Sequence, residues 1–258
     1  MTAEAWTLAA LAGVLGLMVG SFLNVCIHRL PRRESIIWPA SRCPACGHPI
    51  RWVHNVPLVG FLVLGGRCAS CRAPISWRYP IVEAITGGLF VLHVAVIGPE
   101  WLLVPRLLFA AAMVALFAID LEHQILPNVI TLPGIVAGLA FSVALPPGLT
   151  SAVIGAVAGG GLPYVIAWTY FLWRGVDGLG FGDVKMLAMI GAFLGWPAML
   201  LTLALASVTG ALVGGALILL GRGDGQLKLP FGTFLAVSAL VASLWGDGII
   251  LWYTGFYA

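Results

Sequence analysis

Residues 178–185 read Gly-Leu-Gly-Phe-Gly-Asp-Val-Lys and lie between two strongly apolar segments. Three glycines in five residues precede Asp183, and a long apolar run follows it. Glycine adopts positive φ and lets another chain approach closely, whereas an acid before an apolar run can cap the helix that follows. Taken alone, the stretch is more typical of a helix cap than of a catalytic carboxylate at a membrane surface, so the rest of the chain has to distinguish the two.

The composition is that of an integral membrane protein. Hydrophobic residues make up 60% of the 258 positions and charged residues 9%, whereas a soluble globular protein carries about 25% charged residues. The 33 glycines and 16 prolines argue against long unbroken helices but are tolerated in membrane bundles. We therefore expect an all-α polytopic membrane protein that contacts lipids and has no nucleic-acid partner.

Eight apolar runs are candidate transmembrane helices. They cover residues 6–27, 82–98, 102–120, 129–146, 150–173, 184–195, 198–220 and 231–253. The uncharged stretch from Met186 to Leu220 could pass for one helix, but it would be about 52 Å long against about 30 Å of hydrocarbon. Gly195-Trp196-Pro197 provides a break. We therefore predict about eight transmembrane helices, of which the sixth is short.

The basic residues are concentrated in one loop. Eight of the thirteen lie within residues 29–78, where Glu34 is the only acid, so the positive-inside rule places this loop in the cytoplasm. No basic residue precedes the first apolar run, unlike in a cleaved signal peptide, so we expect a retained helix with its N-terminus outside. With eight spans, twelve of the thirteen basic residues lie at the cytoplasmic face, and Arg106 is the exception. The C-terminus then lies outside as well.

Two Cys-x-x-Cys pairs lie in this loop, Cys43 with Cys46 and Cys68 with Cys71. Two such pairs can supply the four thiolates of a closed tetrahedral zinc site. Redox dithiols or disulfides are the alternative, which a reducing cytoplasm disfavours. We predict a structural zinc site whose binding supplies much of the folding energy of the loop. The expected segments are a first transmembrane helix (1–27), a zinc-binding cytoplasmic module (28–79) and a membrane helical bundle (80–258).

Two carboxylates stand at the ends of predicted helices. Asp120 closes the third helix, Asp183 begins the sixth, and the eight-span topology puts both at the same cytoplasmic depth. Acids at such positions are costly and are candidates for function. If the two meet, one can act as general base on a water while the other, still protonated, polarises a peptide carbonyl. The glycines before Asp183 would leave room for a substrate backbone, so the pattern indicates aspartic peptidase chemistry at a membrane boundary.

Alternatives remain open at this point. Glu122 is a possible partner of Asp183 in place of Asp120, although residues two apart on a helix point to different faces. The rival function is a transporter, for which Gly159-Gly160-Gly161 with Pro163 could break a helix. Small residues in membranes more often pack helices together. A transporter would also carry its acids near the bilayer midplane rather than at one face.

The motifs, in their order along the chain, resemble those of the type IV prepilin peptidases (prepilin leader peptidase/N-methyltransferases), which are membrane aspartic proteases with a Gly-x-Gly-Asp motif. The resemblance covers nearly the whole chain. It rests on Gly-Ser-Phe-Leu-Asn-Val at 20–25, His-Arg-Leu-Pro at 28–31, the two cysteine pairs, Asn-Val-Pro-Leu at 55–58, Arg-Tyr-Pro-Ile-Val-Glu at 78–83, Ile-Asp at 119–120, Gly-Phe-Gly-Asp-Val-Lys at 180–185 and Leu-Pro-Phe-Gly at 229–232.

The resemblance implies an enzyme of the bacterial inner membrane whose catalytic pair is Asp120 and Asp183. Its substrates would be type IV prepilins and type II secretion pseudopilins, cut after a glycine at the cytoplasmic face. Gly180, Gly182 and Lys185 would form the loop where the substrate approaches. Many members then methylate the new N-terminal residue with S-adenosylmethionine, an activity associated with the cytoplasmic loop. The sequence identifies neither the S-adenosylmethionine site nor the oligomeric state.

Three positions depart from the family pattern. His54 stands where an acid often precedes Asn-Ile-Pro, Asn128 stands where an acid often follows Leu-Pro, and Glu122 takes a position that is often aspartate. None of these changes touches the two predicted catalytic aspartates, so the expectation of peptidase activity is unaffected. The change at His54 falls in the loop associated with methylation.

Overall fold

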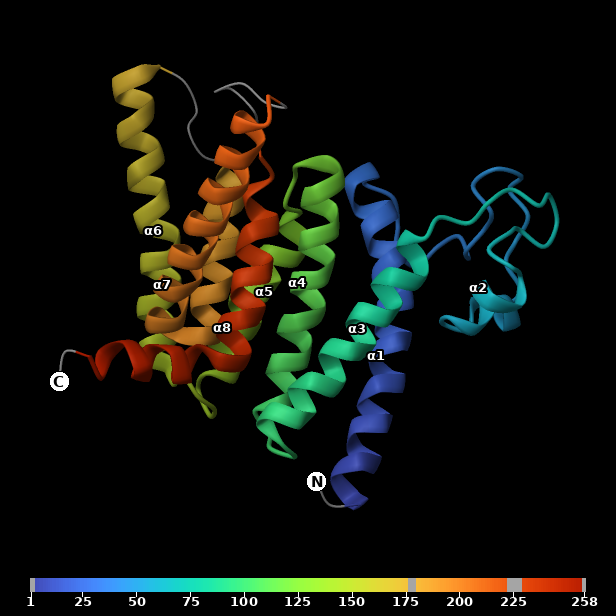
Figure 1. Ribbon diagram of the computed structural model, residues 1–258, viewed down its shortest axis with the longest axis horizontal. Coiled ribbons are helices and arrows are strands. Elements are labelled where there is room, and N and C mark those ends of the chain that lie inside the picture. Colours follow the sequence, from blue (N-terminus) through green and yellow to red (C-terminus); the bar gives the residue numbers. More distant parts are fainter. Residues whose placement is uncertain (1–2, 176–179, 222–228, 257–258) are drawn as a thin grey trace. The chain divides into compact units, whose positions relative to one another are not determined.

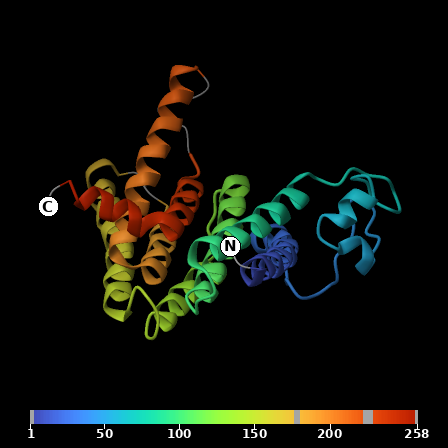
Figure 2. The same ribbon diagram turned by 60° about the horizontal axis from the view of Figure 1, so that its bottom comes forward.

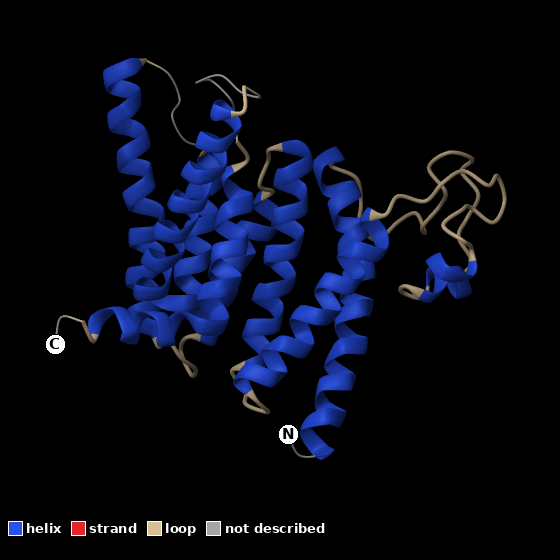
Figure 3. Cartoon of the chain, in the orientation of Figure 1, coloured by secondary structure: helices blue, strands red, loops and turns tan. Residues whose placement is uncertain are grey.

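The computed structural model describes residues 3–175, 180–221 and 229–256, and these are helical apart from their connecting loops (Figure 1, Figure 3). Among the described residues, β-pairing is limited to two isolated bridges in the cysteine loop. The predicted all-α class is therefore confirmed. Gly178 of the opening motif and the basic residues Arg222 and Lys228 lie outside the described residues. The elements are α1 (Ala3–Arg29), the 3-10 helices η1 (Leu30–Arg32) and η2 (Trp52–Asn55), α2 (Val59–Val63), α3 (Arg78–Ile97), α4 (Leu103–His123), α5 (Asn128–Phe141), α6 (Leu149–Arg174), α7 (Phe181–Leu219) and α8 (Phe231–Thr254).

The chain forms two compact units, Met1–Leu103 and Val104–Ala258. The first contains α1, α3 and the cysteine loop, and the second contains α4 to α8. Helix α3 therefore belongs to the same compact unit as α1. The sequence pattern had placed residues 80–97 in the helical bundle of residues 80–258 instead. The grouping follows from the packing of α3 on α1. The sequence gives no sign of this contact, because a long loop separates the two helices.

In the first unit, α1 and α3 lie side by side (Figure 2) because small residues let their backbones touch. A Cβ at Gly16 would lie 2.8 Å from the Gly87 Cα, and one at Gly20 would lie 2.7 Å from the Glu83 Cα. Membrane helices commonly associate through such small residues, since close backbone approach maximises van der Waals contact. The cysteine loop begins where α1 ends and returns where α3 begins, so both of its ends are fixed to this helix pair.

In the part of the chain that the structure describes, six helices are long and apolar enough to cross a membrane, namely α1, α3, α4, α6, α7 and α8. Many of their large apolar side chains are exposed, including Leu11, Val14, Leu172 and Leu212, as expected where lipid rather than protein covers the surface. The protein is therefore a multi-pass membrane protein. The predicted count of eight spans is not confirmed, because α5 has only 14 residues and α7 is bounded by Phe181 and Leu219 as a single element.

The predicted break at Gly195-Trp196-Pro197 is confirmed within α7. Gly195 has φ 81° and ψ 171°, so the element consists of two helical segments joined at a kink. The chain reverses direction there, as contacts with α8 show. A Cβ at Gly246, late in α8, would lie 3.8 Å from the Ala198 Cβ, whereas one at Gly214 would lie 2.9 Å from Leu229, which precedes α8. The second segment of α7 is thus antiparallel to α8.

The first segment of α7 is antiparallel to α6, and glycines bring the two backbones together. A Cβ at Gly191 would lie 2.1 Å from the Gly155 carbonyl oxygen, and one at Gly159 would lie 2.6 Å from the Leu187 carbonyl oxygen. Helix α6 continues past this point to Arg174. The glycine cluster at 159–161 therefore serves helix packing, and the broken helix that would favour a transporter is not present in α6.

Large side chains fix α4 to the rest of the second unit. Phe109 and Phe193 have ring centroids 5.2 Å apart, and Phe109, Met113 and Leu116 share one buried cluster with residues of α7 and α8. Near the start of α4, Arg106 donates to the Ser243 hydroxyl at 3.4 Å. These contacts fix α4 along its length against α7 and α8.

Candidate functional site

Asp120 is buried near the C-terminal end of α4 and is held by the start of α8. Asp120 is only 4% exposed, and its Oδ2 accepts the Thr233 N–H at 2.9 Å. The Gly232 N–H lies near the same carboxyl group. The first N–H groups of a helix have no partner within the helix and carry its positive end. The start of α8 therefore forms a binding site for the Asp120 carboxylate.

This arrangement depends on the missing side chain of Gly232. A Cβ at position 232 would lie 2.8 Å from Asp120 Oδ2 and 3.0 Å from its Cγ. Leu-Pro-Phe-Gly at 229–232 belongs to the family pattern, but neither this motif nor Thr233 was predicted to hold Asp120. A signal was available, since Pro230 stands immediately before the first residue of a long apolar run, as is typical of a helix start, where free N–H groups attract an anion.

Asp183 lies in the first turn of α7 and is close to Asp120. Its N–H donates to the Gly180 carbonyl oxygen at 3.0 Å, and a Cβ at Gly180 would lie 2.9 Å from Asp183 Oδ2. The charge of Asp120 acts electrostatically on Asp183. The two aspartates therefore lie near enough for one to influence the other, although 63 residues separate them (183 − 120). That they act as one catalytic pair stays a prediction.

Four helix ends meet around this pair, and Leu126 packs between two of them. A Cβ at Gly182 would lie 3.0 Å from the Leu126 Cβ, and one at Gly232 would lie 3.1 Å from the Leu126 Cδ1. Leu126 lies in the turn between α4 and α5, and it is buried. The end of α4 and the starts of α5, α7 and α8 therefore converge at one end of the unit. The packing role of Leu126 was not predicted, because an apolar residue in a short turn carries no distinctive signal in the sequence.

The remaining predicted residues of the Gly-x-Gly-Asp segment have structural partners. Lys185 donates to the Asn128 Oδ1 at the start of α5, and its ammonium lies 5.2 Å from the Phe181 ring centroid. Gly182 accommodates Leu126, as described above. These contacts fix the first turn of α7 beside α5. Whether Gly180, Gly182 and Lys185 also guide a substrate stays a prediction.

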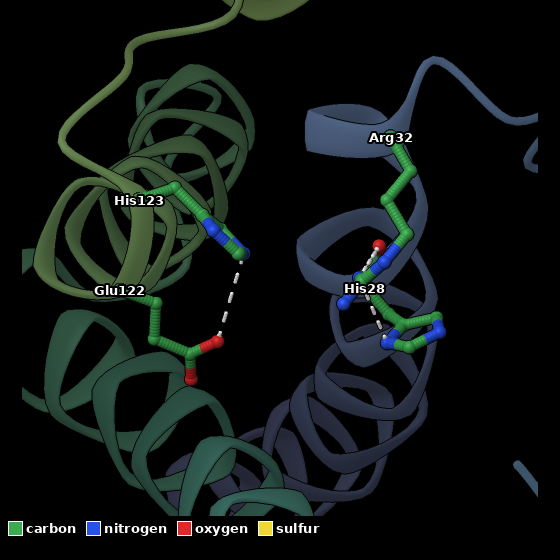
Figure 4. A network of polar contacts seen from close by, with 4 residues as sticks. All are labelled: His28, Arg32, Glu122 and His123. Carbon is green, nitrogen blue, oxygen red and sulfur yellow. Dashed lines mark hydrogen bonds and ion pairs between the residues drawn. The ribbon is translucent and has the colours of Figure 1, made fainter.

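Glu122, unlike Asp120, is exposed. Its Oε2 is 3.9 Å from His123 Nε2, and both side chains are partly exposed, as Figure 4 shows. On the other helix drawn there, Arg32 donates to His28 within the same turn of the first unit. Of the two acids near the end of α4, Asp120 is therefore the one that is buried and that acts on Asp183.

The four predicted metal ligands come together in the first unit. The Sγ atoms of Cys43, Cys46, Cys68 and Cys71 all lie within 4.8 Å of one another, and those of Cys43 and Cys71 are 3.9 Å apart. A tetrahedral ion with Zn–S bonds of about 2.3 Å needs sulfurs about 3.8 Å apart. The four thiols therefore fit one tetrahedral metal ion, and none is paired in a disulfide.

The two cysteine pairs are held by matching turns. Cys43 donates its N–H to the His48 carbonyl oxygen at 2.9 Å, and Cys68 donates to that of Ala73 at 2.9 Å. The residue after each second cysteine, Gly47 or Arg72, has φ of 70° or 60°. The backbone N–H groups of Cys71 and Ser70 lower the pKa of the Cys68 thiol to about 6. Backbone donors thus favour the thiolate form that a metal requires.

Comparison with known proteins agrees with this geometry. The model of the bacterial peptidase A24 N-terminal domain matches residues 14–97, and that of the type IV leader peptidase family matches residues 107–215. The prepilin leader peptidase/N-methyltransferase of Aeromonas salmonicida (strain A449) is 40% identical, with 96% of this chain and 94% of that protein covered. The protein of the same name from Aeromonas hydrophila is 41% identical, with 96% of this chain and 94% of that protein covered. The one from Pseudomonas aeruginosa is 39% identical, with 94% of this chain and 92% of that protein covered. No solved structure matches the chain.

Proposed function

The chain belongs to the type IV leader peptidase family, and from that premise we propose that it is a membrane-embedded aspartic endopeptidase that also N-methylates its product. The substrates are the leaders of type IV prepilins and type II secretion pseudopilins, cut after a glycine at the cytoplasmic face of the bacterial inner membrane. The names of its relatives support both activities. The distribution of basic residues supports the cytoplasmic orientation.

The observation that carries the peptidase proposal is the proximity of two aspartates in different settings. Asp120 is buried against the N–H groups of α8, while Asp183 lies in the first turn of α7 within reach of the charge of Asp120. Two neighbouring carboxyl groups share one proton, because both cannot ionise at close range. One carboxylate then takes a proton from water as the water oxygen attacks the scissile carbonyl carbon. The other, protonated, donates to the carbonyl oxygen, and the leaving amine finally takes up a proton.

The test is cleavage of a purified prepilin by Asp120→Asn and Asp183→Asn variants, read by mass spectrometry. Asparagine preserves side-chain shape but cannot accept the proton, so each variant should lose at least about 100-fold in rate. Glu122→Gln, which removes an exposed acid two residues from Asp120, serves as the matched control and should cleave normally. Full cleavage by either aspartate variant would refute the proposed catalytic pair.

We further propose that the metal at the four cysteines is zinc and that its role is structural. Its support is the all-thiol donor set, which leaves no open position for a substrate. Replacing Cys43 or Cys68 by serine should lower bound zinc and destabilise the loop, whereas Cys26→Ser, which alters a buried cysteine of α1, should leave the zinc content unchanged. Metal analysis that finds no zinc in the purified native protein would remove this proposal.

A further inference from the structure

Residues 52–63 form an apolar segment within the otherwise polar cysteine loop. They include η2 and α2 and carry no charged residue. Trp52 is 81% exposed, and Leu62 and Val63 are each 73% exposed. Large apolar side chains that gather on a surface outside the membrane helices mark a place that another molecule or a membrane covers. The described part of the chain leaves this surface uncovered.

The exposed side chains of α2 share one face. Val59, Leu62 and Val63 have the i, i+3, i+4 spacing that defines one face of a helix. Phe61, on the other face, lines the cavity between the loop and the ends of α1 and α3, whereas those three are not among the described residues that line it. Helix α2 also contacts η2, which carries Trp52. The two short helices therefore form one unit with an apolar outer face.

Helix α3 places this unit at a membrane surface. With 20 residues, α3 is about 30 Å long, which matches the thickness of the hydrocarbon core, so its first residue lies near one membrane surface. Trp77 immediately precedes α3, and the ring centroids of Phe61 and Trp77 are 4.9 Å apart. Helix α2 is therefore attached at the level where α3 enters the membrane.

A hydrogen bond connects the loop to a deeper position on α3. The Leu58 N–H donates to Glu83 Oε2 at 2.8 Å, and Glu83 is five residues beyond the start of α3 at Arg78 (83 − 78). At a rise of about 1.5 Å per residue, this contact lies about 8 Å along the helix axis. Interfacial helices bury their apolar face about 5–10 Å into the boundary between headgroups and acyl chains. The start of α2 thus lies at the depth of an interfacial helix.

The residues around the segment complement a lipid surface. Arg51 and Arg67, both exposed, flank it, and no acid lies between them. Anionic phospholipid headgroups attract arginines that stand beside an apolar surface. Trp52 and Trp77 are also exposed, and tryptophan is enriched where a membrane meets water. Depth, charge and residue type therefore favour a lipid surface over a protein partner.

We propose that residues 52–63 are an interfacial membrane anchor, whose apolar outer face inserts among the anionic phospholipids of the leaflet where α3 begins. The anchor gives the cysteine loop a third attachment, in addition to the ends of α1 and α3. It holds the loop against the membrane surface instead of leaving it free in water. The proposal concerns the position of the loop, so it does not depend on the proposed cleavage or methylation.

The test measures the depth of single residues by electron paramagnetic resonance. The full chain is placed in nanodiscs of equal parts phosphatidylethanolamine and phosphatidylglycerol, and a nitroxide is attached through a keto-bearing phenylalanine at Leu62 or Val63, which leaves the cysteines unmodified. Molecular oxygen concentrates in hydrocarbon, whereas nickel ethylenediaminediacetate stays in water. The oxygen-to-nickel ratio of collision rates should be at least about threefold higher at both positions than at Ala45, because a polar complex enters hydrocarbon poorly. Ala45, an exposed residue between the first two cysteines, is the control.

A substitution next to the label tests the apolar contact directly. Val63→Asp places a charge on the outer face and should lower the ratio at Leu62 at least about twofold, because a charge is costly in lipid. Val63→Ile keeps the face apolar and should leave the ratio unchanged. Thermal unfolding reports whether each chain is folded. If Val63→Asp does not fold, the labels at Leu62 and Val63 in the otherwise unchanged chain decide alone.

Two results would overturn the proposal. A ratio at Leu62 no higher than at Ala45 would mean that the segment faces water. Low collision rates with both oxygen and the nickel complex at Leu62 would mean that protein, such as a second copy of this chain, covers the segment instead of lipid.

Discussion

At the scale of single residues, Gly232 controls the position of Asp120. Because a Cβ there would lie 2.8 Å from Asp120 Oδ2, Gly232→Ala should push the carboxyl group away from the N–H groups of α8. A displacement of about 1 Å in a catalytic group can cost about 100-fold in rate, so we expect at least a tenfold loss of prepilin cleavage. Initial rates measured by mass spectrometry check this.

The control for Gly232→Ala lies on the same helix. Nothing lies within 4 Å of a Cβ at Gly248, so Gly248→Ala should fold and cleave normally, with a slight gain in helix stability. Thermal unfolding of both variants separates a local effect from unfolding. Equal rates for Gly232→Ala and the wild type would show that Asp120 does not depend on the start of α8.

A second residue-scale prediction concerns the turns that hold the cysteines. Gly47 and Arg72 occupy equivalent positions, with φ of 70° and 60°, and a left-handed conformation costs a residue with a side chain about 1–2 kcal/mol. A Cβ at Gly47 would meet nothing within 4 Å, so Gly47→Ala isolates this backbone cost. It should destabilise the loop by about 1 kcal/mol, seen as earlier zinc release in a chelator titration.

The reciprocal change at the other turn should act in the opposite direction. Arg72→Gly removes the strain of a left-handed arginine, and the added flexibility of the unfolded chain offsets part of this gain. We therefore expect zinc release at equal or higher chelator concentration than in the wild type. Earlier release from Arg72→Gly than from Gly47→Ala would show that the arginine side chain, rather than the backbone, stabilises the turn.

At the scale of elements, the reversal within α7 depends on Gly195. A side chain there would need φ near 81°, and its Cβ would lie 2.5 Å from the Ser151 Oγ and 2.9 Å from the Pro147 Cβ. Strain and overpacking together should make Gly195→Ala about 2–4 kcal/mol less stable. Thermal unfolding in detergent measures this effect. Gly215→Ala, in open space on the same element, should not lower the melting temperature.

Sequence patterns predicted the elements better than their contacts. The apolar runs and Gly195-Trp196-Pro197 identified the helices and the break, because hydrophobicity and backbone restrictions act locally. Charge patterning indicated that Asp120 and Asp183 lie at one level. By contrast, the donor to Asp120 is a backbone N–H of Thr233, 113 residues away. Every residue but proline has such a group, so the helix start near Pro230 indicates a place where an anion can bind but does not identify Asp120 as that anion.

The cysteine loop illustrates the same limit. The spacing of its four cysteines predicted their convergence, since metal ligands are chemically distinctive. The bond between the Leu58 N–H and Glu83 Oε2, at 2.8 Å, was not predicted. It depends on how the loop folds back onto α3, and the sequence carries no sign of that contact.

At the scale of the whole molecule, the number of membrane crossings determines where the chain ends lie. Within the described residues, six helices qualify by length and composition, and α5 would be a seventh span. Counting the two antiparallel segments of α7 separately makes eight. The short α5 and the first segment of α7 are each about 21 Å long, so both need local thinning of the bilayer or flanking polar residues to cross. With eight crossings, both chain ends lie on the same side; with seven, they lie on opposite sides.

We predict eight crossings with both ends in the periplasm, because the basic loop after α1 belongs in the cytoplasm. Alkaline phosphatase, which is active only in an oxidising compartment, should therefore be active when fused after residue 258. A fusion after Ile50, in the cysteine loop, should be inactive and serves as the internal control. Activity at Ile50 would invert the topology. Inactivity at both positions would mean an odd number of crossings, so that α5 or one segment of α7 would not span the membrane.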